Sequence, residues 1–212
     1  MVHMKTIACI IARTNSQRLP KKVLKNIAGR MMIEHIILRL KKTQFVDDIY
    51  ICTSTHPNDQ ILKDVAKKNS VKFFAGSEES VIERMLDVAK LENAENLIRI
   101  CGDCIFVDSV YLDLMILNHI QNNMDYTRTE LLPVGITSEV IRTDALKKCY
   151  KKMDPIYSQY LMFYMFDPEE YKCLVILPPK VHQRADWCLT VDTPKDWERT
   201  KTIFTMIQEY IS

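Results

Sequence analysis

The amino-acid sequence predicts an α/β protein in which a mostly parallel sheet lies between two layers of helices, a three-layer α/β/α sandwich. Apolar runs alternate with longer segments of helical periodicity through residues 1–122. The first run, Thr6–Ile11, ends at a polar loop, as is typical of a central strand buried on both faces. Strands that alternate with helices of about ten or more residues imply right-handed βαβ units. Such sheets bind ligands beyond the carboxyl ends of their strands.

Four strands and four helices are expected in the first part of the chain. The expected strands are Thr6–Ile11, 48–52, 71–74 and 96–100. Apolar residues spaced by three and four predict helices over Met32–Leu40, 58–68, 78–91 and 109–120.

The pattern becomes looser after residue 123. The expected elements there are strands at 125–127, 138–142 and 171–177, a helix-like segment at 157–166 and a strand end at 190–192. A last helix is expected from Pro194 to about residue 210, because proline is well tolerated at a first helical position. We therefore expect one domain, 1–212, with a regular half (1–122) and a smaller mixed half (123–187).

Composition excludes some classes of partner. The 29 basic and 27 acidic residues leave a formal charge of +2, which gives no whole-chain attraction to nucleic acid or to an anionic membrane. The apolar stretch near the N-terminus is far shorter than the roughly 20 residues that span a bilayer. We expect a cytoplasmic protein with neither nucleic acid nor membrane as partner.

Seven cysteines, an odd number, do not indicate a disulfide framework. Four of them, Cys9, Cys52, Cys173 and Cys188, lie in apolar strand-like runs and are expected to be reduced, buried thiols. Cys101 and Cys104 have the spacing of a redox or half-zinc motif, but no second such pair completes four zinc ligands. Packing residues are the favoured interpretation, and a thiol oxidoreductase is the alternative.

The loop that follows the first strand, 12–22, is rich in cations and small polar residues. Guanidinium and ammonium groups at the carboxyl end of a buried strand can hold a triphosphate. The loop lacks the glycines of a P-loop or a dinucleotide fingerprint. A solvated basic turn is the alternative.

Two acids are expected at strand ends. Asp103 follows Gly102, and a carboxylate in such a position can approach a bound triphosphate and is a natural magnesium ligand. Asp192 lies between an expected strand and the last helix. The alternatives are that Asp103 caps the next turn and that Asp192 caps the helix. If both acids are ligands, they can share one cation.

Several segments resemble the CTP-dependent sugar-acid cytidylyltransferases, a family that includes the acylneuraminate and 3-deoxy-manno-octulosonate enzymes, and the spore-coat-polysaccharide branch most of all. The resemblance lies in the opening signature, which comprises residues 11–13, Ser16, 18–22, 27–29 and 32–35. It implies a Rossmann-like fold of the nucleotide-diphospho-sugar transferase type. It also implies Mg²⁺-dependent transfer of CMP from CTP to a small acidic sugar, a 2-keto sugar acid, with release of pyrophosphate, for a surface polysaccharide or lipopolysaccharide.

The resemblance also implies the roles of individual residues. The catalytic residues would be Arg13, Lys22 and Asp103, and the metal ligands Asp103 and Asp192. The nucleotide-binding residues would be Ala12, Arg13, Ser16, Arg18, Lys22, Thr53, Ser54, Gly76, Ser77, Arg84 and Gly102. From the residues alone, Thr53 and Ser54 can equally be a helix-capping pair, and Arg84 an ordinary surface cation.

The implied division is a CTP-binding half, 1–122, and an acceptor and dimerisation half, 123–187. The turn 133–135 and Glu139 resemble the acceptor side, although a solvent-facing Glu139 is the favoured interpretation. A homodimer is expected through an apolar surface on the smaller half, with burial in the core as the alternative. That surface would comprise Tyr157, Tyr160, Met162, Phe163 and Met165.

Three departures from the family pattern fall near the acceptor and metal. Ile105 replaces a proline, 154–157 replaces an Arg-Glu-His triplet, and Cys188 replaces an arginine. They leave open a phosphorylated non-sugar acceptor or a non-catalytic nucleotide-binding relative. The histidines without clustered partners are expected at the surface or in packing: His35, His56, His119 and His182.

Overall fold

A computed structural model describes residues 3–154, 157 and 161–211, and it contains one seven-stranded sheet. The strands of the sheet are β1 (Thr6–Ile11), β4 (Asp48–Ser54), β5 (Lys72–Gly76), β6 (Asn96–Cys101), β7 (Tyr126–Thr129), β8 (Glu139–Arg142) and β9 (Cys173–Ile176). A separate two-stranded ribbon joins β2 (Asn26–Ile27) and β3 (Arg30–Met31). The order in the main sheet is β5-β4-β1-β6-β8-β7-β9.

The sheet is mostly parallel, as predicted. β5, β4, β1 and β6 run parallel to one another. β8 is antiparallel to both β6 and β7, and β9 is parallel to β7, so β8 alone among these strands runs in the opposite direction. The carboxyl ends of β1, β4, β5 and β6 therefore meet at one edge, where the loops that follow them lie close together.

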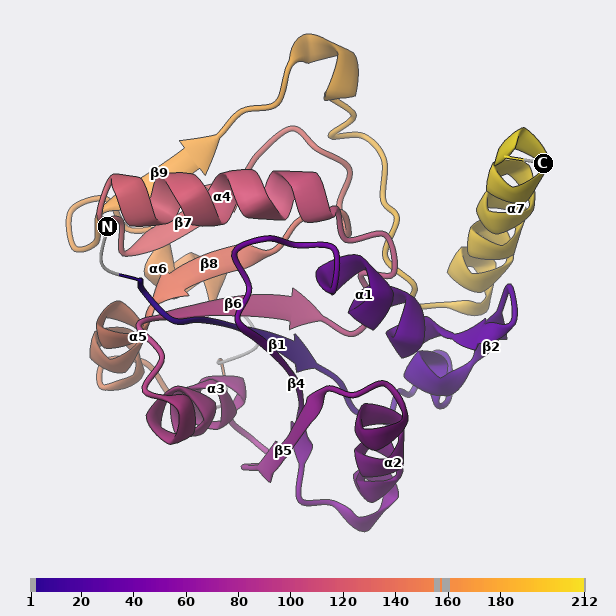
Figure 1. Ribbon diagram of the computed structural model, residues 1–212, viewed down its shortest axis with the longest axis horizontal. Helices are drawn as coiled ribbons and strands as arrows, with labels where there is room; N and C mark the ends of the chain where they lie inside the picture. The colour runs from indigo at the N-terminus through magenta and orange to yellow at the C-terminus, as the bar shows by residue number, and fades with distance from the viewer. Residues whose placement is uncertain (1–2, 155–156, 158–160, 212) are drawn as a thin grey trace.

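Helices cover both faces of the sheet (Figure 1). They are α1 (Met32–Leu40), α2 (Ile61–Lys68), α3 (Val81–Glu92), α4 (Ser109–Gln121), α5 (Thr143–Tyr150), α6 (Met162–Met165) and α7 (Pro194–Ile211). One core cluster unites residues of α1, α2 and α4, and a second unites residues of α3, α5 and α6 on the opposite face. The predicted three-layer α/β/α architecture is confirmed.

β1 shows why the sheet is buried on both sides. Ala8 and Ile10 belong to one core cluster, whereas Ile7 and Cys9 belong to the other, and all four side chains have no exposed surface. Successive strand residues point to opposite faces. An uninterrupted apolar strand can therefore contribute to two cores at once.

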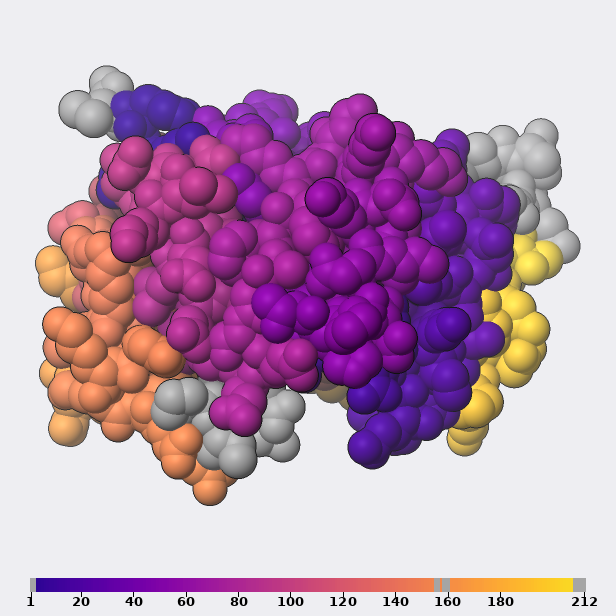
Figure 2. All heavy atoms as spheres, turned by 90° about the horizontal axis from the view of Figure 1, so that it is seen from below, coloured from indigo at the N-terminus to yellow at the C-terminus, as the bar shows by residue number. Residues whose placement is uncertain are grey.

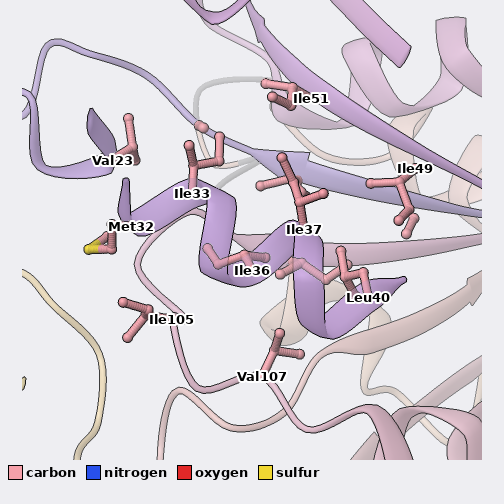
Figure 3. Packing of buried hydrophobic residues seen from close by; sticks show 14 of the residues in the cluster. Val23, Met32, Ile33, Ile36, Ile37, Leu40, Ile49, Ile51, Ile105 and Val107 are labelled. Atoms are coloured by element: carbon pink, nitrogen blue, oxygen red, sulfur yellow. The ribbon is translucent and has the colours of Figure 1, made fainter. Parts of the chain in front are cut away.

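α1 links the sheet to the segment that follows β6. In Figure 3, Ile33 and Ile37 point toward Ile51 and Ile49 of β4, and the opposite side of the helix faces the segment that contains Ile105 and Val107. Ile105 is fully buried. The isoleucine that replaces a family proline is thus a core residue, which anchors the chain just after Asp103.

Some local predictions were wrong. α5 was not predicted, because its eight residues bury only a few apolar side chains among lysines and other polar residues. Residues 190–192 do not form a regular strand; nearby, Val134 and Cys188 make an isolated parallel bridge. Residues 57–60 form a 3₁₀ turn before α2, with proline at its start. Cys188 is exposed and Cys173 only half-buried, although both were expected to be buried.

Seen from below in Figure 2, the indigo-to-purple residues that follow β1 and the orange residues of the smaller half lie at opposite ends of the molecule, whereas the first described residues, also indigo, lie above the orange end. α7, in yellow, flanks the indigo end. Within the described residues, no helix combines the length and apolar character needed to cross a bilayer.

Candidate active site

Two cavities lie at the carboxyl edge of the sheet. The first, here called the cationic cavity, has a volume of about 590 Å³. Four of its lining residues are cations and two are carboxylates. Its lining comprises Ile11, Ala12, Arg13, Lys22, Glu78, Glu79, Val81, Arg84 and Arg99. The surplus of positive charge suits a polyanion such as a triphosphate.

The second cavity, here called the mixed cavity, has a volume of about 640 Å³. It is lined by the ends of β6, β7 and β8, by the 130–135 segment, by Thr190 and Asp192, and by α6. Its charged side chains are Arg99, Asp103, Arg128, Glu130, Glu139 and Asp192. Apolar walls with a few convergent polar groups are typical of a site for a small molecule.

Lys22, Asp103 and Asp192 meet where the two cavities adjoin. The Nζ of Lys22 donates to Oδ2 of Asp103 at 3.0 Å and to Oδ1 of Asp192 at 2.7 Å. Burial alone would lower the pKa of Lys22, but the two carboxylates outweigh that effect and raise it. Arg18 lies 3.3 Å from the same oxygen of Asp192, and its side chain is largely exposed.

This carboxylate pair fits a divalent cation. Two aspartates converge on a single positive charge, the Lys22 ammonium. Carboxylate oxygens are the ligands that Mg²⁺ prefers. Asp103 and Asp192 therefore meet at one cation, the Lys22 ammonium, and their sharing of a magnesium ion stays a prediction.

The helix-capping alternative for Asp192 is wrong, and Asp103 does not cap α4. Thr193 and Asp196 cap α7 reciprocally: the Asp196 carboxylate accepts from the Thr193 backbone N–H at 2.9 Å, and the Thr193 hydroxyl accepts from the Asp196 backbone at 3.2 Å. α4 is capped by Asp108, which accepts from Val110 and Tyr111. The Asp103 and Asp192 carboxylates are therefore left to face Lys22.

Gly102 brings Asp103 into place. Its backbone N–H donates to the Ile11 carbonyl at 2.9 Å, and a Cβ on this glycine would lie 3.0 Å from that oxygen. A side chain at position 102 would therefore push the strand ends apart. From the other side, the Val191 N–H donates to the Asp103 carbonyl at 3.1 Å, which fixes the segment that carries Asp192.

The basic loop is held in shape by Asp59, which the sequence analysis did not single out. Its Oδ1 accepts from both the backbone N–H and the hydroxyl of Thr14 at 2.7 Å, and its Oδ2 accepts from Ser54 at 2.5 Å. Burial favours a raised pKa for Asp59, but these hydrogen bonds outweigh burial and lower it. An acid inside a proline-led turn gives no sequence signal that distinguishes it from an ordinary surface residue.

The loop residues divide into two groups. Arg13, Lys22 and Ala12 line the cationic cavity, and their contacts with a nucleotide stay a prediction. Ser16 instead shapes the loop, because its hydroxyl donates to the Leu19 carbonyl and accepts from the Lys22 N–H at 3.3 Å. A wholly solvated basic turn is therefore wrong for this loop.

Arg84 is not a surface cation, because its side chain is fully buried. Its Nη1 donates to the Ser77 carbonyl at 2.6 Å, whereas Nε and Nη2 have no hydrogen-bond partner among the described residues. Burial, with help from the charge of Arg13, lowers the pKa of Arg84 to about 10. Gly76 leaves room for it, since a Cβ there would lie 3.2 Å from the Arg84 Cγ. Unpaired donors beside a cavity indicate an anionic ligand.

Thr53 and Ser54 lie behind the cationic cavity and do not line it. Both side chains are buried, and the Ser54 hydroxyl is used on Asp59 and on the His56 N–H at 3.3 Å. The helix-capping alternative is wrong for Ser54, because the 3₁₀ turn that follows is capped by His56, whose side chain accepts from the Asn58 N–H at 3.2 Å. A nucleotide contact at these two positions stays a prediction that requires backbone groups.

A second charged cluster connects Arg99, Glu139 and Tyr126. Arg99 Nη1 donates to Oε2 of Glu139 at 2.6 Å, and the Tyr126 hydroxyl donates to Oε1 at 2.6 Å. The side chains of Arg99 and Glu139 are 14% and 12% exposed, so the expectation of a solvent-facing Glu139 is wrong. Arg99 was missed because a single arginine inside a strand-like run carries no spacing signal.

Cys101 and Cys104 both line the mixed cavity, and neither is in a disulfide. The Cys104 thiol lies 3.5 Å from Oδ1 of Asp103 and is buried. Among the described residues, no three His, Cys, Asp or Glu side chains form a cluster that could hold a metal ion.

The residues of the expected dimer surface do not all lie at the surface of the molecule. Tyr157 and Phe163 are 48% and 74% exposed, whereas Met165 is fully buried in the core, as the alternative held. Met162 packs against the same core cluster. Tyr160 lies outside the described residues. His119 is buried, and its Nδ1 lies 2.8 Å from the Thr127 hydroxyl, which agrees with a packing role.

An open α/β sheet with a cationic cavity, a carboxylate pair and a mixed cavity at its carboxyl edge defines a nucleotidyltransferase-type protein. Comparison with known proteins gives the particular family. The family model for cytidylyltransferases matches residues 7–202, and the chain belongs to this family.

Individual proteins are also similar to this chain in sequence or in structure. The spore coat polysaccharide biosynthesis protein SpsF of Bacillus subtilis is 31% identical over 209 residues, 95% of this chain and 87% of that protein. 3-deoxy-manno-octulosonate cytidylyltransferase 2 of Hydrogenovibrio crunogenus is 32% identical over 105 residues, 47% of this chain and 41% of that protein. The solved structure of a cytidylyltransferase from Leptospira borgpetersenii has a TM-score of 0.89 at 27% identity, and the match covers 96% of this chain and 88% of that one.

Proposed function

We propose that this cytidylyltransferase moves CMP from CTP to a small acidic sugar, a 2-keto sugar acid, with release of pyrophosphate and with Mg²⁺ as cofactor. The observation that carries the proposal is the position of Lys22, which lines the cationic cavity while it bridges two carboxylates that line the mixed cavity. A triphosphate in the first cavity would thus end beside an acceptor in the second.

The cationic cavity supports CTP as the donor. Arg13 and Lys22 come from the loop after β1, and Arg84 comes from α3 with two unpaired nitrogens. These groups bind the phosphates and balance their charge. Since an arginine fork recognises phosphate oxygens through paired donors, Arg84 fixes orientation as well as charge.

Asp103 and Asp192 would hold the magnesium ion. Bound there, it would supply the positive charge that stabilises the phosphoryl oxygens during transfer. In the structure Lys22 is paired with both of these carboxylates, so its ammonium would move toward the phosphate oxygens if the carboxylates bound the metal ion.

The mixed cavity supports an acidic acceptor. Its cations are Arg99 and Arg128, set among apolar walls from the 131–134 segment and α6. Arg128 is held by an ion pair with Glu130 and by the Phe166 ring, whose centroid lies 4.2 Å from the guanidinium carbon. Four carboxylates also line this cavity: Glu139 and Glu130 pair with the two arginines, and the magnesium ion would offset the charge of Asp103 and Asp192. The remaining donors of the two guanidinium groups suit one carboxylate on a compact polar molecule. The name of SpsF supports a polysaccharide pathway as its setting.

The reaction is an in-line displacement. An acceptor oxygen attacks the α-phosphorus of CTP, the new P–O bond forms as the bond to pyrophosphate breaks, and pyrophosphate leaves through the cationic cavity. The protein contributes positioning and electrostatic stabilisation, and no covalent nucleophile is required.

Titration of CTP, UTP, ATP and GTP into the protein with magnesium tests the donor. Pyrophosphate release is then followed with 3-deoxy-manno-octulosonate, N-acetylneuraminate and phosphorylated polyols as acceptors. Selective CTP binding and release with a sugar acid is the expected result. Release with a phosphorylated polyol alone would contradict the acceptor, and equal binding of all four nucleotides would contradict the donor.

A further inference from the structure

Arg99 is the one described residue that lines both cavities. It lies near the carboxyl end of β6, two positions before the strand ends at Cys101. Arg13, Lys22 and Arg84 line only the cationic cavity, and Arg128 lines only the mixed cavity. Among the described cations, the Arg99 side chain is thus placed between the two binding spaces.

Sheet pairing explains how Arg99 is held there. Arg99 of β6 is directly opposite Glu139 of β8 in the antiparallel register, and directly opposite residues project from the same face. One step deeper, the pair Leu97 and Ile141 is apolar and belongs to the core cluster under α3 and α5. Along β6 and β8, the paired positions thus change from apolar residues in the core to an ion pair at the end of the sheet that lines the cavities.

Both oxygens of the Glu139 carboxylate accept hydrogen bonds from residues of the sheet. One oxygen accepts from Arg99 and the other from the Tyr126 hydroxyl, each at 2.6 Å, and Tyr126 is fully buried. Two short bonds to one carboxylate restrict the rotamers of all three side chains. Glu139 and Tyr126 thus define where the Arg99 guanidinium lies.

Stability is a weak reason for such a pair. Desolvation of two charges commonly offsets their attraction, and apolar residues of similar volume stabilise a core at least as well. The pair and Asp103 line the same mixed cavity. A charged group held rigidly beside developing charge is the arrangement that accelerates phosphoryl transfer.

We propose that Arg99 is a catalytic residue that contacts both substrates, the α-phosphate of CTP from the cationic cavity and the acidic acceptor from the mixed cavity. Glu139 and Tyr126 are positioning residues that act through it. Arg99 thereby couples occupation of the two cavities. This inference rests on the proposed function, because it requires a nucleotide in one cavity and an acceptor in the other.

The test compares Arg99→Met and Arg99→Lys with wild type, using CTP and whichever sugar acid supports the fastest pyrophosphate release. Arg99→Met is expected to lower kcat by roughly 100-fold, the size of effect seen when one oriented donor is removed, and to raise KM for both substrates. The kcat of Arg99→Lys is expected to lie between those of wild type and Arg99→Met, because lysine keeps the positive charge but lacks the planar guanidinium with its paired donors. Glu139→Gln is expected to lower kcat roughly 10- to 100-fold through misplacement of Arg99.

Arg142→Met is the matched control. Arg142 lies in β8, the strand that carries Glu139. It forms an ion pair with Asp125 at 3.6 Å and lines neither cavity. Its replacement is expected to change Tm and to leave kcat and both KM values unchanged. Wild-type kinetics for Arg99→Met, or a rise in KM for one substrate alone, would overturn the proposal while the proposed function stands. Wild type that shows no CTP-dependent release would overturn both.

Discussion

The ammonium of Lys22 lies 2.7 Å from Oδ1 of Asp192, although 170 positions separate the two residues in the chain. The same ammonium lies 3.0 Å from Asp103. One cation from the loop after β1 thus unites carboxylates from the end of β6 and from the start of α7.

Lys22→Met should separate the structural role of the ammonium from its catalytic role. Without it, Asp103 and Asp192 repel each other, so Tm should fall in the absence of metal. Magnesium should then raise Tm more in Lys22→Met than in wild type, because it no longer competes with the ammonium. Pyrophosphate release should fall by roughly 100-fold or more. Thermal unfolding with and without magnesium measures this, and an equal magnesium effect in both proteins would contradict the shared position.

Asp59→Asn should loosen the basic loop. Asparagine has nearly the same shape, but it replaces one acceptor oxygen of the carboxylate with an NH₂ group and removes the negative charge. One of the hydrogen bonds from Thr14 or Ser54 is then lost, so the free energy of unfolding should fall by roughly 1–3 kcal/mol at pH 7. KM for CTP should rise, since Arg13 and Lys22 belong to the same loop. Asp144→Asn, at an exposed carboxylate, is the control.

The difference in unfolding free energy between wild type and Asp59→Asn should depend on pH. The pKa of Asp59 is lowered in the folded state, so the stabilisation is present above the unfolded value of about 3.9 and is lost as pH falls through the lower folded value. Denaturant unfolding of wild type and Asp59→Asn should differ most near neutral pH and converge in acid. A difference that grows as pH falls below 4 would contradict the ionised network.

Cys104→Ser tests the thiol alternative. If Cys101 and Cys104 are packing residues beside Asp103, serine should keep pyrophosphate release within a few-fold of wild type and cost stability of about 1–3 kcal/mol at a buried site. Reducing agent should have no effect on wild-type turnover. Abolished turnover in Cys104→Ser at wild-type Tm would support a thiol mechanism instead.

Gly102→Ala tests the close approach of β1 and β6. The added Cβ would lie 3.0 Å from the Ile11 carbonyl and 3.2 Å from the Val23 side chain, so the Asp103 turn must shift. We expect a loss of roughly 1–3 kcal/mol in unfolding free energy and a lower kcat with little change in KM for CTP. Gly29→Ala is the control, because a Cβ there meets nothing within 4 Å, although its positive φ adds some strain.

Residues at strand ends were predictable from the sequence because periodicity locates the strands and parallel strands end at one edge. The Thr6–Ile11 run was predicted with its observed bounds, and Asp103 was predicted just beyond the end of a strand. That Asp192 lies opposite Asp103 was implied by the family resemblance, because the strand expected before Asp192 does not form. Their actual partner in the structure, Lys22, was predicted to lie in the same site, but the contact itself depends on tertiary packing.

Asp59, Arg99 and Tyr126 were not predictable for a different reason. Each is a single polar residue in a turn or a strand, and its role follows from a neighbour that is distant in sequence: Thr14 for Asp59, and Glu139 for both Arg99 and Tyr126. Composition and spacing carry no record of such pairs. The strand expected at 190–192 does not form, because the Val191 N–H donates to the Asp103 carbonyl in the turn after β6 and not to a neighbouring strand.

The most direct test of the central claim is pyrophosphate release from CTP with magnesium and a 2-keto sugar acid, measured for wild type and for Asp103→Asn. We predict magnesium-dependent release by wild type and a loss of roughly 100-fold or more in Asp103→Asn at similar CTP affinity. Equal rates for the two proteins, or wild-type release that does not require magnesium, would contradict the assignment of the Asp103 and Asp192 pair as the reaction centre.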